Sequence, residues 1–124
     1  MRENMGLYRG KRKDNGEWET GSLVVIRPDC SDQQTFIADK MTGYHTLVLP
    51  ETVGQFTGLT DKNGVKIFEG DIVRYEDDIG YVIYNGDDAR FLVDSPNMYI
   101  SMDYSNEFEV IGNIHDNPEL LQKI

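Results

Sequence analysis

The chain has 124 residues, a formal net charge of −10 and 39% hydrophobic residues, a composition that fits one soluble domain with a core of its own. A single cysteine, Cys30, excludes an internal disulfide, and no apolar run reaches the roughly 20 residues of a membrane helix. Because the start at Met1 is too polar for a signal peptide, we expect a cytoplasmic protein that does not enter membranes.

The negative charge is concentrated in the second half of the chain. Residues 1–54 hold seven Lys or Arg and eight Asp or Glu, whereas residues 55–124 hold five and fourteen. We expect a single domain over residues 1–124, with an N-terminal β subregion at 1–54 and an acidic β core at 55–124 as a candidate subdivision.

The first half predicts a hairpin followed by less regular strands. The Asn15-Gly16 step suits a tight hairpin turn because both residues tolerate positive φ. Pro28 and Pro50 are expected boundaries, since proline cannot donate a hydrogen bond to a strand ladder. The predicted strands of this half are 7–12, 18–26, 35–38 and 44–49.

Turn-forming residues dominate the stretch 55–73, which contains no group that resembles a catalyst. A Thr-Gly-Leu turn is predicted around Gly58, and a polar turn is predicted at Asp61–Gly64, which includes Asn63. The second turn does not have the spacing of a calcium loop, since Gly64 stands at loop position 4 instead of position 6.

A further turn is predicted around Gly70. We expect Gly70 to hold a positive φ in a solvated turn and the Asp71 carboxylate to accept a hydrogen bond from the backbone that follows it. Solvation would keep Glu69 and Asp71 from forming an acid–base pair with shifted pKa values.

Short runs of aromatic and branched residues, separated by polar breaks, fill the rest of the chain. Runs 81–84 and 91–93 are apolar on both faces, so we expect them in the centre of a sheet. The predicted strands of this half are 72–75, 81–84, 89–93, 98–102 and 108–111. The predicted core residues are Val73, Tyr81, Ile83, Phe91, Val93, Val110 and Ile111.

A turn of helix is predicted at 117–121. Asn117 can cap it, Pro118 fits the first helical position, and Glu119 complements the positive end of the helix dipole. The expected fold is mainly β: a compact barrel-like or sandwich-like meander of short strands that ends in a short helical turn.

Three blocks resemble the YopX-like family of bacteriophage and prophage proteins: 7–17 (LYRGKRKDNGE), 50–73 and 109–121 (EVIGNIHDNPELL), in the order of that family. The resemblance implies a small, mainly β protein encoded by a phage or prophage, and it brings no catalytic residue or cofactor with it. The turn residues inside the second and third blocks form a structural signature: Gly58, Asp61, Asn63, Gly64, Gly70, Asp71, Gly112, Asn117 and Pro118.

His45, His115 and Cys30 are the candidates for a metal site or a Cys–His pair. Cys-x-x-Cys and His-x-x-x-His spacings are absent, so we expect structural roles for these three residues and no metal or other cofactor. The acidic pairs Asp77-Asp78 and Asp87-Asp88 are expected to be solvated loop tips.

Basic residues cluster once, at Arg9–Lys13, which we expect to be a solvated hairpin tip. Direct nucleic-acid binding is therefore disfavoured, because it needs clustered cations that release counterions. Five of the seven tyrosines lie in the acidic half, and those that point outward offer apolar area with a hydrogen-bonding tip. The alternative for them is core packing and isolated surface positions. The candidate interaction residues are Tyr75, Tyr84, Tyr99 and Tyr104.

These patterns indicate a noncatalytic cytoplasmic binding or assembly module that forms a homo-oligomer and binds a host or phage protein. The alternative is a nucleic-acid-directed accessory protein, either an acidic decoy for a DNA-binding protein or a weak binder through Arg9 to Lys13. A hydrolytic enzyme is least favoured, because no nucleophile–base pair or metal constellation appears. Salt separates the first two: a decoy complex should weaken steeply with ionic strength, whereas an apolar tyrosine interface should not.

Overall fold

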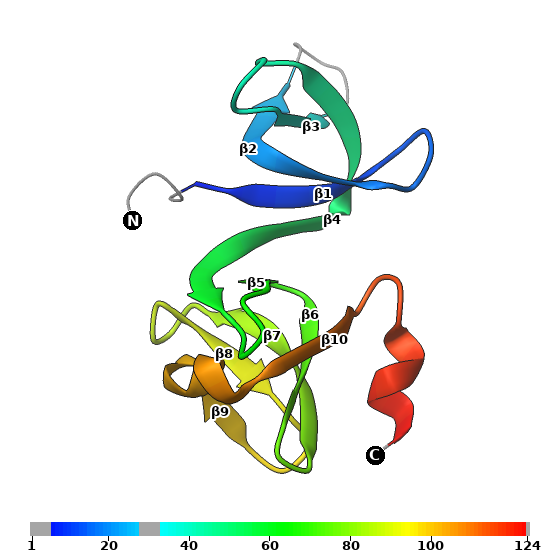
Figure 1. Ribbon diagram of the computed structural model, residues 1–124. Helices are drawn as coiled ribbons and strands as arrows, with labels where there is room; N and C mark the ends of the chain where they lie inside the picture. Colours follow the sequence, from blue (N-terminus) through cyan, green and yellow to red (C-terminus); the bar gives the residue numbers. More distant parts are fainter. Residues whose placement is uncertain (1–5, 28–32, 124) are drawn as a thin grey trace. The chain divides into compact units, whose positions relative to one another are not determined.

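The computed structural model describes residues 6–27 and 33–123 and is mainly β (Figure 1). It holds two antiparallel five-stranded sheets and ends in a short 3-10 helix, so the predicted fold class is confirmed. The chain divides into two compact units, Met1–Phe56 (unit 1) and Thr57–Ile124 (unit 2), each of which is described by itself. Pro28, one of the expected strand boundaries, lies outside the described residues.

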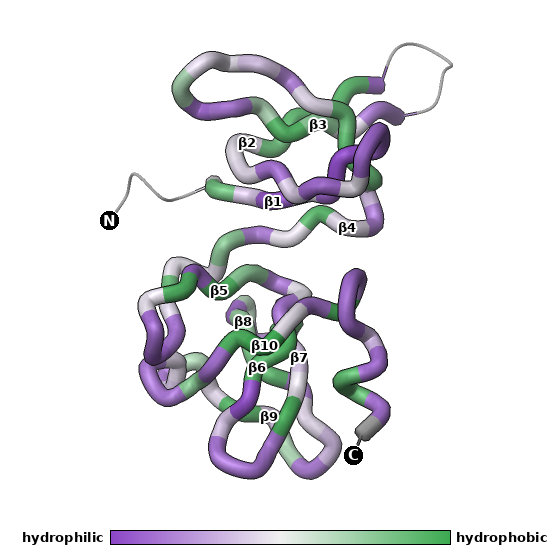
Figure 2. Tube along the Cα trace, turned by 45° about the vertical axis from the view of Figure 1, so that its right-hand side comes forward, coloured by the Kyte–Doolittle hydropathy of each residue, from purple (hydrophilic) through white to green (hydrophobic). Residues whose placement is uncertain are grey.

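Every predicted strand has a counterpart, and the structure adds one more strand, β5. The strands are β1 (Tyr8–Arg12), β2 (Trp18–Ile26), β3 (Gln34–Ala38), β4 (His45–Thr60), β5 (Lys66–Phe68), β6 (Asp71–Tyr75), β7 (Asp78–Asn85), β8 (Arg90–Asp94), β9 (Tyr99–Ser101) and β10 (Glu109–Asn113). In Figure 2, hydrophobic residues lie along β3, β6 and β8, whereas β1 and several loops are hydrophilic.

Strands β1 to β4 of unit 1 close into a ring. β1 pairs with both β2 and β4, and β3 pairs with both β2 and β4, so the pairings of these four strands form a closed cycle, and β4 also pairs with β5. The predicted hairpin turn is confirmed, since Gly16 has φ 76° and the Arg12 N–H donates to the Glu17 carbonyl at 2.7 Å. The ring is narrow: a Cβ on Gly21 would collide with the carbonyl of Ala38 on β3.

Strand β4 runs straight through Pro50, so the boundary predicted there is wrong. The β1–β4 register shifts between Arg9 and Lys11, and Pro50 falls in the irregular part of β4, where no ladder donor is required. Thr52 links the two strands at this irregularity: its Oγ1 accepts from the Lys11 N–H at 2.9 Å and donates to the Leu49 carbonyl at 2.6 Å.

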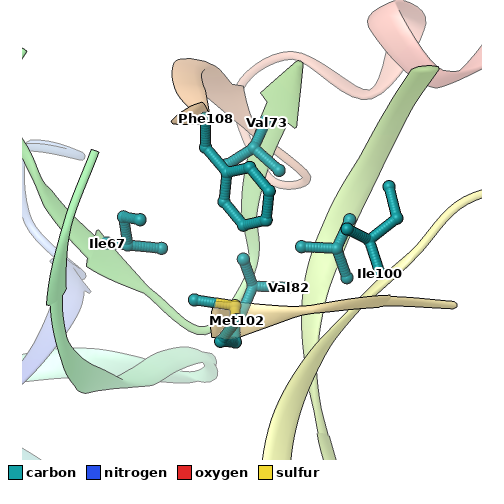
Figure 3. Close-up of a cluster of buried hydrophobic side chains, with 7 residues drawn as sticks. Ile67, Val73, Val82, Ile100, Met102 and Phe108 are labelled. Carbon is teal, nitrogen blue, oxygen red and sulfur yellow. The ribbon is translucent and has the colours of Figure 1, made fainter. Parts of the chain in front are cut away.

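The second sheet has the strand order β10-β6-β7-β8-β9, which places β7 and β8 inside it, as predicted. Unit 2 holds a cluster of buried side chains contributed by β5 to β9, by the following helix and by the residue before β10 (Figure 3). Its members are Ile67, Val73, Val82, Val93, Ile100, Met102 and Phe108.

The predicted core is partly correct. The predicted residues that belong to the cluster or pack against it are Val73, Phe91, Val93 and Val110. The prediction is wrong for Tyr81, Ile83 and Ile111, which stay half-buried. Val82 packs in the core instead of Tyr81 and Ile83, because a strand that is apolar on both faces does not specify which face turns inward. Ile111 falls at a register shift in the β10–β6 pair, where a β-bulge interrupts the ladder.

Two short 3-10 helices complete unit 2: η2 (Met102–Glu107), which the sequence did not predict, and η3 (Pro118–Lys123). The N-terminal residue of η3 is Pro118, as expected. Asn117 precedes it, and its carbonyl accepts from the Leu120 N–H at 3.1 Å. The Asn117 side chain points back toward β10: its Oδ1 accepts from the Asn113 N–H at 3.2 Å and would lie 2.6 Å from a Cβ on Gly112.

Candidate functional site

An open hollow of about 230 Å³ lies in unit 2, where β4 ends, β8 begins and η2 starts. We call it the Phe91 pocket, and its lining residues are Thr57, Leu59, Arg90, Phe91, Ser101, Met102 and Asp103. Its volume is smaller than the roughly 300–1,000 Å³ of small-molecule sites, so it suits one or two side chains better than a cofactor.

The apolar part of this pocket continues the core. Met102 is 8% exposed and belongs to the buried cluster (Figure 3), and Phe91 packs against that cluster. Leu59, the residue before the last one of β4, is 38% exposed and therefore offers apolar surface to a partner. Because closely packed side chains stay in fixed rotamers, the pocket is a preformed feature.

Tyr84 extends the apolar surface beside the pocket. It is the ladder partner of Phe91, so the two side chains stand on the same face of the sheet. The ring centroids are 5.2 Å apart with an interplanar angle of 72°, an edge-to-face contact. Tyr84 is the outer member of this aromatic pair, and 49% of its surface is exposed to solvent.

Gly58 shapes one wall of the pocket. The predicted Thr-Gly-Leu turn is wrong, because β4 continues to Thr60, but Gly58 does hold a positive φ of 89° within the strand. The hydroxyl of Thr57 donates to the Ile67 carbonyl at 2.8 Å and accepts from the Leu59 N–H at 3.2 Å. The wall is thus fixed by backbone conformation and by one side-chain hydroxyl.

The rim of the pocket is polar, with one acidic and one basic lining residue and two further carboxylates in the adjoining hairpin tip. Asp103 lines it at the start of η2, where the Ser101 Oγ accepts from the Asp103 N–H at 3.1 Å. On the other side, Arg90 Nε lies 3.7 Å from the carboxylate of Asp88, and Asp87 neighbours Asp88 in the exposed tip of the β7–β8 hairpin. The tip residue Ala89 has φ 54°, a left-handed conformation that is costly for alanine.

The four candidate tyrosines do not form one surface. Tyr75 is half-buried, and its ring lies 5.5 Å from that of Tyr104 and 5.6 Å from that of Phe108. Burial raises the pKa of Tyr75, and the charge of Glu76 adds to the rise. Tyr99 and Tyr104 are 64% and 47% exposed. Of the four, Tyr84 is the one whose ring contacts a lining residue of the Phe91 pocket.

Asp61, a residue of the turn signature, is only 4% exposed and accepts hydrogen bonds from three backbone N–H groups. Its Oδ1 accepts from the N–H groups of Asn63 and Val65 at 2.8 and 2.9 Å, and its Oδ2 accepts from that of Val110 at 2.9 Å. Burial acts to raise the pKa of Asp61, but these donors outweigh it and leave the pKa lowered. The predicted polar turn is present, with Gly64 at φ 81°.

The turn at Gly70 is buried, which corrects the prediction of a solvated turn. The predicted positive φ is confirmed at 94°. Asp71 is 2% exposed, and its Oδ2 accepts from the N–H of Phe68 at 2.8 Å, a bond to the backbone that precedes it. His115 is half-buried beside this turn, with its Nε2 3.8 Å from where a Gly70 Cβ would lie.

The basic cluster at the β1–β2 hairpin is largely engaged within unit 1. The guanidinium of Arg9 lies 4.8 Å from the ring centroid of Trp18, and the Lys11 ammonium lies 5.9 Å from it. Arg12 pairs with Asp14 at 2.9 Å and with Glu19 at 3.2 Å. The hydrogen bond to Asp14 raises the pKa of Arg12 and lowers the pKa of Asp14. These contacts compete with phosphate binding.

Of the three candidate metal ligands, His45 belongs to unit 1 and His115 to unit 2. His45 is exposed, with its Nδ1 2.8 Å from the Gly43 carbonyl and its ring edge-on to Phe36. Cys30 lies outside the described residues. Within residues 6–27 and 33–123, no group of three or more His, Cys, Asp or Glu side chains could hold a metal ion. In the same part of the chain, no helix has the length and apolar character needed to cross a membrane.

Comparison with known proteins places the chain in a family. A search of curated proteins finds no match. The YopX protein family matches residues 7–122, which is nearly the whole chain and includes the turn signature and the lining of the Phe91 pocket. The chain therefore belongs to the YopX family.

Proposed function

We propose that this YopX-family protein is a noncatalytic binding or assembly module that docks a protein partner at the Phe91 pocket. We further propose that a bacteriophage or prophage encodes the protein and that the protein acts in the cytoplasm of the bacterial host. The partner is a protein of the host or of the phage. Catalysis and a cofactor have no part in the proposal.

The single observation that carries the proposal is the Phe91 pocket with Tyr84 beside it. Protein interfaces concentrate their binding energy in a few anchors that fill well-packed pockets. The pocket provides such a cavity of about 230 Å³ over a rigid floor, and Tyr84 adds a half-exposed ring next to it. Tyrosine is enriched at interfaces because it combines apolar area with a hydrogen-bonding tip.

Assembly with a second copy is the other part of this proposal. The sheet of unit 2 ends at β9, a three-residue strand at an edge of the sheet. Two large side chains at this edge are exposed, Met98 at 53% and Tyr99 at 64%. Open edges and exposed apolar side chains favour self-pairing, so we expect a symmetric homo-oligomer at micromolar concentration. A monomer mass by light scattering at micromolar concentration would refute the homo-oligomer.

The nucleic-acid-directed alternative is less well supported. Arg9, Lys11 and Arg12 are engaged with Trp18, Asp14 and Glu19, which leaves little of the basic cluster for phosphates. An acidic decoy remains compatible with the charge of residues 55–124. Such a decoy would present charge to its partner and would not need an apolar pocket.

Site-specific photocrosslinking in host cells tests the proposal. A benzophenone amino acid replaces Tyr84 in one variant and Val65, which is 47% exposed and does not line the pocket, in the control. We expect a protein adduct of discrete mass from position 84, its absence from position 65, and its loss when Leu59→Ser is added. Equal adducts at both positions would refute docking at this pocket, and nucleic-acid adducts at position 84 would favour the alternative.

A further inference from the structure

We infer that the segment bound at the Phe91 pocket is basic and extended, with one large apolar side chain seated in the pocket and Lys or Arg residues on either side of it. This inference rests on the proposed function and names the chemistry of the partner. It is argued from the size of the pocket, the charges around it and the position of Tyr84.

The pocket admits an apolar side chain and little more. Thr57, Arg90, Ser101 and Asp103 are the polar lining of its volume of about 230 Å³, and the apolar lining comes from Leu59, Phe91 and Met102. A single Leu, Met or aromatic side chain that enters it loses contact with water and gains contact with these three residues. The chain on both sides of that anchor then crosses the polar rim.

The charge at the rim selects the flanking residues. Asp103 lines the pocket on the η2 side, and Asp87 and Asp88 occupy the hairpin tip on the β8 side. The one cation of the lining, Arg90, lies 3.7 Å from Asp88, so that carboxylate offsets its charge. An acidic segment or a nucleic-acid backbone would meet net repulsion here, whereas a basic segment finds complementary charge on both sides.

Tyr84 supplies a place for one of those cations. Its half-exposed ring stands at the end of β7, one residue before the hairpin that carries Asp87 and Asp88. An ammonium or guanidinium group over an aromatic ring is attracted by the ring's negative face, and nearby carboxylates strengthen the attraction. Aromatic surface and carboxylates together therefore favour Lys or Arg beside the apolar anchor.

The test is fluorescence anisotropy of labelled short peptides with the full-length protein. The first peptide holds one Trp between Lys residues; the second has Ala in place of Trp; the third has Glu in place of every Lys. We expect only the first to bind, with an affinity that falls as salt is raised. No binding of the first peptide overturns the inference, as does equal binding of the second, which would mean attraction by charge alone, or of the third.

Variants locate the site. Leu59→Ser removes apolar lining and should weaken the first peptide about tenfold, as loss of an interface anchor does. Asp87→Asn with Asp88→Asn should weaken it less and flatten its salt dependence, because two rim charges are lost. Glu76→Gln with Asp77→Asn is the matched control: it makes the same change of charge at the other end of β7 and should have no effect. Equal weakening by both charge pairs would overturn the inference.

Two results separate this inference from the proposed function. If the position-84 crosslink captures a protein while the basic peptide does not bind, the pocket has a partner of different chemistry, and only the inference fails. If light scattering shows an oligomer that Leu59→Ser dissociates, the occupant is a second copy of the chain, and the basic segment is again excluded. Absence of any crosslink at position 84 removes the proposed function itself.

Discussion

Units 1 and 2 are both antiparallel, but they bury very different amounts of apolar side chain. Among the described residues, the buried hydrophobic side chains of unit 1 are Ile37, Ala38, Val48 and Phe56. Those of unit 2 are Ile67, Phe68, Ile72, Val73, Val82, Leu92, Val93, Ile100, Met102 and Phe108. Unit 1 thus relies on the closure of its hydrogen-bonded ring, and unit 2 relies on its core.

The comparison also explains where the candidate site lies. Side chains that pack against a core are held in fixed rotamers, so a pocket that continues a core keeps its shape. Phe91 and Met102, the inner wall of the pocket, belong to or contact the cluster of unit 2. The charge follows the same division, since fourteen of the 22 acidic residues lie in residues 55–124.

The largest effect is expected from Phe108→Ala, which removes the fully buried ring of the unit 2 core. Loss of a buried Phe side chain costs about 3 to 5 kcal/mol of unfolding free energy. Val48→Ala, its counterpart in unit 1, removes less apolar volume and should cost clearly less. Native-state hydrogen exchange measures each unit separately. A greater loss for Val48→Ala would contradict the ranking of the two cores.

Gly21→Ala tests the dependence of unit 1 on ring closure. The added methyl would meet the backbone carbonyl of Ala38, so β2 and β3 must separate. Overpacking of this kind costs about 1 to 3 kcal/mol, and amide exchange should accelerate across β1 to β4. Thr20→Ala, at the exposed neighbouring position, is the control. Unchanged exchange in Gly21→Ala would show that the ring tolerates a wider spacing.

Asp61→Asn tests the buried turn of unit 2. The amide group offers one acceptor oxygen, so it cannot satisfy all the N–H donors of Asn63, Val65 and Val110, and a loss of about 1 to 3 kcal/mol is expected. Because the folded-state pKa of Asp61 is lowered, its stabilisation is present above the unfolded pKa and is lost as pH falls through the folded pKa. The difference between wild type and variant should therefore shrink in acid.

Asp39 of unit 1 provides the exposed counterpart. Its Oδ1 accepts from the N–H groups of Met41 and Thr42 at 2.8 and 3.0 Å, and the bond from Thr42, followed by that from Met41, lowers its pKa. Water can replace these bonds, so Asp39→Asn should have a smaller effect than Asp61→Asn. Urea unfolding between neutral and acid pH compares the two variants. An equal loss in both would mean that burial of Asp61 adds nothing.

Gly70→Ala isolates the cost of backbone conformation. The nearest atoms to an added Cβ lie 3.8 Å away, an ordinary contact, so the cost comes from φ 94°. We expect a loss of about 1 to 2 kcal/mol. Gly43→Ala in unit 1, with φ 75° and nothing within 4 Å, should lose a similar amount. Thermal unfolding measures both, and a much larger loss for Gly70→Ala would point to crowding in the buried turn.

The sequence predicted those features of the fold that depend on residues close together in the chain. The Asn15-Gly16 hairpin, the polar turn at Asp61–Gly64 and the positive φ of Gly70 follow from residues that tolerate turn conformations, and the structure has them. Strand positions followed from runs of branched and aromatic residues, and each run has its strand. Pro118 begins the last helix for the reason the sequence gives.

What the sequence did not predict depends on contacts between distant residues. Pro50 does not end β4, because Thr52, two residues further along, accepts a hydrogen bond from Lys11 on β1 and so keeps the two strands together. The inward face of β7 is set by the cluster around Val82, which local alternation does not reveal. The Phe91 pocket joins three separate segments, and of its lining only Phe91 was singled out, and then as a core residue.

The smallest effect is expected where unit 2 is most acidic. Asp87 and Asp88 are exposed, and among the described residues no carboxylate group assembles a metal site, so Asp87→Asn with Asp88→Asn should change the unfolding free energy by less than about 0.5 kcal/mol. Relief of repulsion within the acidic half can even make the sign favourable. Thermal unfolding with EDTA, and then with calcium added back, should give the same midpoint. A large, saturable rise with calcium would show that the carboxylates of unit 2 bind an ion, and the acidic rim of the Phe91 pocket would then have to be reinterpreted as part of an ion site.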